Sequence, residues 1–72
     1  MYILNVLHRK SMKHEIESQA IEFQNLYYAI DRAIAEQKKW KNEFYKIAVR
    51  EYNSSLETFG KTFYYASNCV GM

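Results

Sequence analysis

The sequence predicts an α+β fold in which one amphipathic helix lies across one face of an antiparallel four-stranded sheet, in the order ββαββ. Residues 45–49 alternate between apolar and polar side chains, which is the two-residue period of a strand with one buried face. A second aromatic and β-branched run, residues 58–65, follows the turn-forming residues 53–55. Asn25 is a suitable N-cap for a helix that begins at Leu26. Together these observations favour two hairpins separated by a helix.

The first hairpin is predicted from the N-terminal third of the chain. Tyr2–Arg9 reads as a strand with two apolar faces, which is typical of a central strand. Residues 10–13 form a polar turn, and residues 14–21 form the second strand. On this strand we expect Ile16 and Ala20 to point inward. The expected outward side chains are Glu15, Glu17 and Gln19.

The helix is predicted from apolar residues at helical spacing. The stripe expected to face the sheet contains Leu26, Tyr27, Ile30, Ala33, Ile34 and Gln37. The residues expected largely outside that stripe are Asp31, Arg32, Glu36 and Lys39. Basic residues near its end oppose the partial negative charge of a helix C-terminus.

An all-α helical hairpin is the alternative fold. Apolar residues from Ile16 to Ile34 also recur in alternating steps of four and three, which resembles a heptad seam. The aromatic and β-branched clusters in residues 45–49 and 58–65 favour the ββαββ fold instead. We expect a single domain over residues 1–66 and a flexible tail over residues 67–72.

Composition limits the function classes. Seventy-two residues make one small domain, and seven Tyr, four Phe and one Trp are more aromatics than its core can hide. This surplus predicts a protein interface, with a partner or with a second copy as a homo-oligomer. The net charge of +2 is too small to indicate nucleic acid by itself. A lone Cys69, and no apolar run of the roughly 20 residues that cross a bilayer, predict a cytoplasmic location away from membranes.

The candidate binding surface is the sheet face that the helix leaves uncovered. Lys46, Arg50 and Tyr52 alternate with the core residues, and the fourth strand adds Tyr64 or Tyr65 beside them. Trp40, at the end of the helix, is either a lid on the core or an exposed anchor. The candidate protein-binding residues are therefore Trp40, Lys46, Arg50, Tyr52 and Tyr64. The alternative is a nucleic-acid-binding face made of Arg9, Lys10, Lys13, Lys46 and Arg50.

The sequence contains no clear pattern for a catalytic site or a metal site. His8 and His14 are six residues apart and Cys69 is distant, which is not the spacing of a zinc site. Glu15 and Glu17 share a strand face, but acid–base catalysis also needs a pocket that separates their pKa values. The chain has no glycine-rich phosphate loop. We therefore expect a non-enzymatic protein without cofactor, metal or small-molecule substrate.

The layout resembles that of very small phage-encoded regulators and host-defence inhibitors with ββαβ or ββαββ folds. The resemblance depends on Tyr2–Arg9, the helix capped by Asn25 and the hairpin of residues 45–49 and 58–65. It implies binding to a host factor as an inhibitor or regulator, and it carries no site residue over to this chain.

Overall fold

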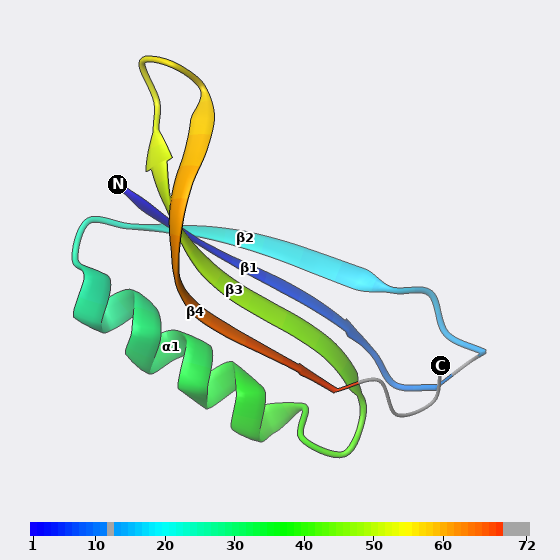
Figure 1. Ribbon diagram of the computed structural model, residues 1–72. Coiled ribbons are helices and arrows are strands. Elements are labelled where there is room, and N and C mark those ends of the chain that lie inside the picture. Colours follow the sequence, from blue (N-terminus) through cyan, green and yellow to red (C-terminus); the bar gives the residue numbers. More distant parts are fainter. Residues whose placement is uncertain (12, 69–72) are drawn as a thin grey trace.

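The computed structural model describes residues 1–11 and 13–68 and has the α+β fold expected from the sequence. Its elements are β1 (Tyr2–Arg9), β2 (Glu17–Phe23), α1 (Leu26–Lys39), β3 (Phe44–Asn53) and β4 (Thr58–Asn68). The four strands form one antiparallel sheet in the order β2-β1-β3-β4, and α1 lies along one side of it (Figure 1). The all-α alternative is therefore wrong.

The core lies between α1 and the two central strands. Leu4 and Val6 of β1 pair with Val49 and Ile47 of β3, and all four side chains are fully buried. From the helix, Ala29 and Ala33 close over them, together with partly buried apolar neighbours. Small alanines allow α1 to approach the branched side chains of the sheet closely. The alternation predicted for residues 45–49 is confirmed.

The helix begins where the sequence predicts but faces the sheet along a slightly different stripe. The Asn25 side chain accepts hydrogen bonds from the backbone N–H groups of Tyr27 and Tyr28, at 2.8 and 3.3 Å. Tyr27 and Ile34, expected inside, are 77% and 37% exposed. Glu36, expected outside, is buried. The buried stripe instead runs through Ala29, Ala33 and Glu36.

The second strand is also displaced from its predicted position. β2 starts at Glu17 rather than residue 14, and Ile21 pairs with the core residue Leu4. Side chains alternate along a strand, so Ile21 and not Ala20 lies on the helix side. Ile16 and Ala20, expected to point inward, are both exposed. The strand lies at an edge of the sheet, where its pairing with β1 decides the register.

The β3–β4 hairpin extends beyond the other strands. Its end, residues 52–61, projects from the sheet, and we call it the arm (Figure 1). Two register shifts occur along β4, between Val49 and Arg50 and between Arg50 and Tyr52, and each adds one residue to β4. Asn53 orders the turn, because its side-chain oxygen accepts from the N–H groups of Ser55 and Leu56.

The C-terminal end of the sheet lies further along the chain than the sequence predicts. β4 continues to Asn68, so Ser67 and Asn68 belong to the sheet rather than to the expected tail. Residues 69–72, with Cys69, lie outside the described part of the chain. Within residues 1–11 and 13–68, no helix has the length and apolar character needed to cross a membrane.

Candidate interaction surface

The sheet face opposite α1 is uncovered throughout the described part of the chain (Figure 1). We call it the open face. Its centre is formed by Ile3, Asn5 and Leu7 of β1, which alternate with the core residues of the same strand. Neighbouring side chains cover most of Ile3, which is 9% exposed, whereas Asn5 and Leu7 are partly exposed. Lys46, Ala48 and Arg50 of β3 lie beside them, so the predicted placement of Lys46 and Arg50 is confirmed.

Strand pairing arranges the open face in three rows that cross all four strands and a short fourth row, at the ends of β1 and β3, that contains Arg9 and Phe44. The first row contains Glu22, Ile3, Arg50 and Thr62. The second row contains Ala20, Asn5, Ala48 and Tyr65. The third row contains Ser18, Leu7, Lys46 and Ser67. Apolar side chains therefore occupy much of the centre, an acid lies on the β2 side, two cations lie on β3 and Arg9 lies at the end of β1.

A shallow apolar hollow lies in the middle of this face. It has a volume of about 190 Å³ and is lined by Asn5, Leu7, Lys46, Ile47, Ala48, Arg50 and Tyr65. Two donors beside it, Asn5 Nδ2 and Arg50 Nε, have no hydrogen-bond partner among the described residues and are covered by neighbouring atoms of the same chain. A buried donor without an acceptor costs free energy, commonly about 1–3 kcal/mol. Because both atoms are covered already, the open face offers a partner the apolar lining of the hollow rather than these donors.

At the arm, the open face continues into a small aromatic cluster. The guanidinium of Arg50 lies 3.9 Å from the centre of the Phe59 ring, and the rings of Tyr52 and Phe59 are 5.0 Å apart. Phe59 pairs with Tyr52 across the hairpin and is 46% exposed. The sequence analysis missed Phe59, although its position across the turn from Tyr52 was the available signal.

Trp40 and Tyr64 lie on the helix side of the sheet, so Trp40 is the lid on the core rather than an exposed anchor, and Tyr64 is not the tyrosine on the open face. The Trp40 ring stacks on His8, with ring centres 3.7 Å apart and planes at 13°, and its Nε1 donates to Glu36 Oε2 at 3.0 Å. The Tyr64 hydroxyl donates to the side-chain oxygen of Gln37 on α1. Trp40 thus closes the end of the core, and Tyr65 replaces Tyr64 on the open face.

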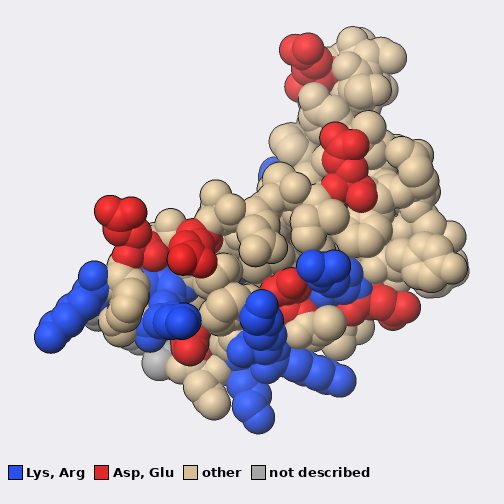
Figure 2. All heavy atoms as spheres, turned by 180° about the vertical axis from the view of Figure 1, so that it is seen from behind, with Lys and Arg blue, Asp and Glu red and all other residues tan. Residues whose placement is uncertain are grey.

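Three members of the predicted nucleic-acid set, Arg9, Lys46 and Arg50, lie on the open face and are spread along its length. Arg9 lies over Phe44, 5.5 Å from its ring centre, and Lys10 and Lys13 belong to the connection between β1 and β2. Lys46 and Arg50 are four positions apart on β3, which separates them by about 13 Å. On the surface shown in Figure 2, basic side chains gather on the lower part, whereas the arm at the top is mostly uncharged with acidic groups.

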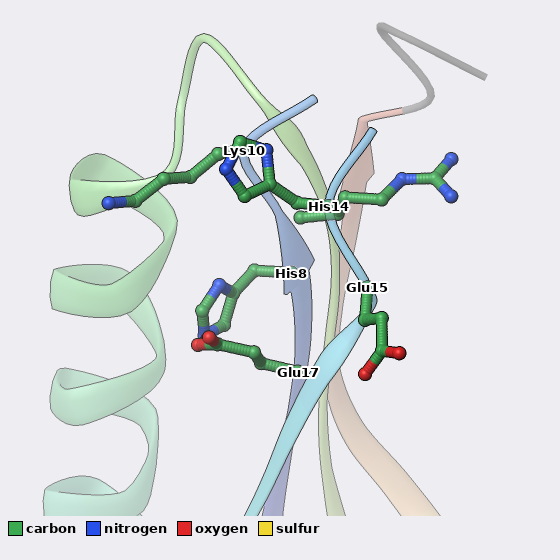
Figure 3. Close-up of a pocket in the computed structure, with 6 residues that line it drawn as sticks. His8, Lys10, His14, Glu15 and Glu17 are labelled. Atoms are coloured by element: carbon green, nitrogen blue, oxygen red, sulfur yellow. The ribbon is translucent and has the colours of Figure 1, made fainter. Parts of the chain in front are cut away.

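A second, polar pocket lies at the end of the first hairpin. It has a volume of about 110 Å³ and is lined by His8, Arg9, Lys10, His14, Glu15 and Glu17. Figure 3 shows His8 and Glu17 pointing toward one another, with Glu15 pointing away. His8 Nε2 is 3.5 Å from Glu17 Oε2, while His14 Nδ1 is bonded to Ser11 Oγ at 2.7 Å.

His8, which lines this pocket, also packs against Trp40. The buried His8 ring lies against Trp40 on one side, and the exposed Glu17 carboxylate contacts its outer nitrogen. Those contacts fix the orientation of the imidazole beneath the indole. Among the described residues, no group of three or more His, Cys, Asp or Glu side chains has a geometry that holds a metal ion.

Comparison of the chain with protein-family models, with curated proteins and with solved structures finds no significant match.

Proposed function

We propose that this protein is a non-enzymatic interaction module that binds another protein chain through the open face of its sheet. The observation that carries the proposal is the apolar hollow at the centre of a sheet face that no helix covers among the described residues. A bound protein surface removes this hollow from water. In this role the chain regulates or inhibits its partner by occupying a surface, in keeping with the small phage regulators that its layout resembles.

The chemistry of the open face favours protein over nucleic acid. Protein interfaces have apolar centres enriched in aromatic residues and Arg, with charged groups toward the rim. The open face follows this pattern, with Ile3 and Leu7 along its middle strand and Tyr65 toward the β4 edge. Nucleic-acid interfaces are more polar and much more positive. Glu22, in the row of Ile3 and Arg50, opposes a phosphate backbone there.

Site-specific photo-crosslinking tests this function. A photoreactive phenylalanine analogue replaces Tyr65 on the open face in one protein and Tyr28 on α1 in a matched control. The two positions are similarly exposed, at 61% and 68%, so nonspecific capture is equal for both. We expect a protein adduct from position 65 only. Excess unlabelled wild-type chain should suppress this adduct, and excess Ala48→Arg chain should not, because the new side chain blocks the hollow.

Three outcomes contradict the proposal. Equal adducts from positions 65 and 28 indicate nonspecific contact. An adduct at position 65 that nuclease removes indicates a nucleic-acid ligand. The absence of any adduct at position 65, at protein concentrations up to the solubility limit, shows that the open face meets no partner.

A further inference from the structure

We infer that the partner of the open face is a second copy of this chain, placed face to face by a two-fold axis that runs parallel to β1 above its centre. The inference builds on the proposed function and adds the identity of the partner. It depends on the three rows of the open face, because strand register fixes which side chains oppose each other under each symmetry operation.

A two-fold axis along β1 gives opposite charges across the interface. This operation places β2 of one copy over β3 of the other and leaves β1 over β1. Glu22 then lies over Arg50 of the second copy, and the reciprocal pair forms by symmetry. Leu7 meets Leu7 of the second copy along the axis, and the small exposed part of Ile3 meets its own equivalent, so apolar groups contact apolar groups. Packed sheets keep strand directions within about 30°, so these central rows stay in register.

The other in-plane axes give poorer contacts. An axis between β1 and β3, parallel to the strands, places Lys46 over Leu7 and Arg50 over Ile3, which buries cations against apolar groups. An axis perpendicular to the strands through the row of Asn5 places Arg50 over Lys46, which brings like charges together. The axis along β1 brings the two copies of Arg9 to the same end of the interface, but it pairs Glu22 with Arg50 twice and places Leu7 against Leu7. Of these three axes it therefore gives the best match of charged and apolar groups.

The same axis brings together the two copies of Asn5. This residue lies on the axis and faces Asn5 of the second copy, so two amides, each with donor and acceptor atoms, meet at the centre of the interface.

The size of the face sets the expected strength of the dimer. The proposed axis superposes three strands, because β4 lies beyond the edge of the second copy. Three strands about 4.8 Å apart and seven paired residues about 3.3 Å apart give roughly 330 Å² per copy. The two copies together then bury roughly 700 Å², well below the ~1,200 Å² of stable standard interfaces. We therefore expect a weak, reversible dimer whose population rises between micromolar and millimolar protein concentration.

Charge reversal and mixing test the inference with the full-length chain. Sedimentation equilibrium of the wild type should show an average mass that rises from 8.7 kDa toward twice that value with concentration. Glu22→Arg alone and Arg50→Glu alone should each remain monomeric, because like charges then face each other twice. An equimolar mixture of the two variants should recover dimers, since both cross-pairs are again of opposite charge. Asp31→Arg on the exposed side of α1 makes the same change in charge and should dimerise as the wild type does.

A second pair of variants keeps the test valid if Arg50→Glu does not fold. The predicted axis places Ser18 over Lys46 of the second copy, whereas Ser67 overhangs the partner's edge. Ser18→Glu should therefore strengthen association about threefold to tenfold through two new ion pairs, and Ser67→Glu should leave it unchanged.

A wild-type chain that stays monomeric at millimolar concentration overturns the inference. A mixture of charge variants that does not dimerise, or equal effects of Ser18→Glu and Ser67→Glu, overturns the proposed axis. In each case the proposed function survives if position 65 still forms a specific adduct with a different protein. If that adduct is also absent, both fail.

Discussion

Replacement of Trp40 separates a structural role from a binding role for this residue. In the structure its ring stacks on His8, its N–H donates to the buried carboxylate of Glu36, and its body packs against the core. All three contacts lie on the helix side of the sheet. We therefore expect Trp40→Ala to destabilise the fold and Trp40→Phe to destabilise it less.

The magnitudes follow from those contacts. Loss of about 100 Å² of apolar burial from the half-buried indole costs about 2.5 kcal/mol. The lost stack on His8 and the lost donor to Glu36 add about 0.5–1.5 and about 1–3 kcal/mol. Because partial relaxation reduces such sums, we expect about 3–5 kcal/mol for Trp40→Ala. Trp40→Phe keeps the ring but not the N–H and should cost about 1–2 kcal/mol.

Urea unfolding followed by far-UV circular dichroism measures both values, because this signal does not depend on the indole. A domain of this size has a free energy of unfolding of about 4–11 kcal/mol, so a loss of this size is measurable. Tyr27→Ala, at a highly exposed position on α1, is the control and should change stability by less than about 0.5 kcal/mol. The reasoning is refuted if Trp40→Ala unfolds at the same urea concentration as Tyr27→Ala.

Three further substitutions test individual features of the fold by the same urea assay. Asn25→Ala removes the N-cap of α1 and should cost about 1 kcal/mol; an unchanged midpoint contradicts the capping role. Tyr64→Phe removes the bond to Gln37 and should cost about 0.5–1.5 kcal/mol, whereas Tyr65→Phe on the open face should cost almost nothing; equal effects would mean the two faces are misassigned. Glu57→Gly relieves a positive φ of 52° in the hairpin turn and should stabilise the fold by a few tenths of a kcal/mol or more, and a loss of stability contradicts this.

The features predicted correctly from sequence are those set by local chemistry. Asn25 caps α1 because its side chain reaches the free N–H groups of the first turn, whatever the rest of the chain does. Tyr2–Arg9 and residues 45–49 lie in the two central strands, where burial imposes a clear pattern. When one face of a strand forms the core, its side chains are apolar at every second position, and the sequence alone shows which face is buried.

The errors arose where long-range contacts choose between equivalent patterns. On β2, Ile16 with Ala20 and Ile21 with Phe23 are equally good apolar pairs, and pairing of Ile21 with Leu4 decides between them. On α1, burial of Glu36 depends on the donors of Trp40 and Arg32, which lie at 3.0 and 3.2 Å and satisfy its carboxylate. Neither contact can be predicted from the spacing of apolar residues along a single strand or helix.

Tyr64 was misplaced because β4 is irregular. Alternation from Thr62 puts Tyr64 on the same face as Arg50, with which Thr62 pairs. The register shift between Val49 and Arg50 inserts one residue, so Tyr64 pairs with Val49 and turns toward α1. A bulge reverses every later assignment along a strand, and local sequence does not reveal it. This correction places Tyr65 on the open face.

The most direct test of the binding role of the open face is a measurement of side-chain access to solvent in the intact protein. Nuclear magnetic resonance with a soluble paramagnetic agent reports solvent access for the methyl groups of Leu7 and Ala48 on the open face and of Ala35 on α1. As protein concentration rises, the broadening of the Leu7 and Ala48 methyl signals should fall while that of Ala35 stays constant. Constant broadening at all three methyl groups up to millimolar concentration would contradict closure of the open face on a second copy.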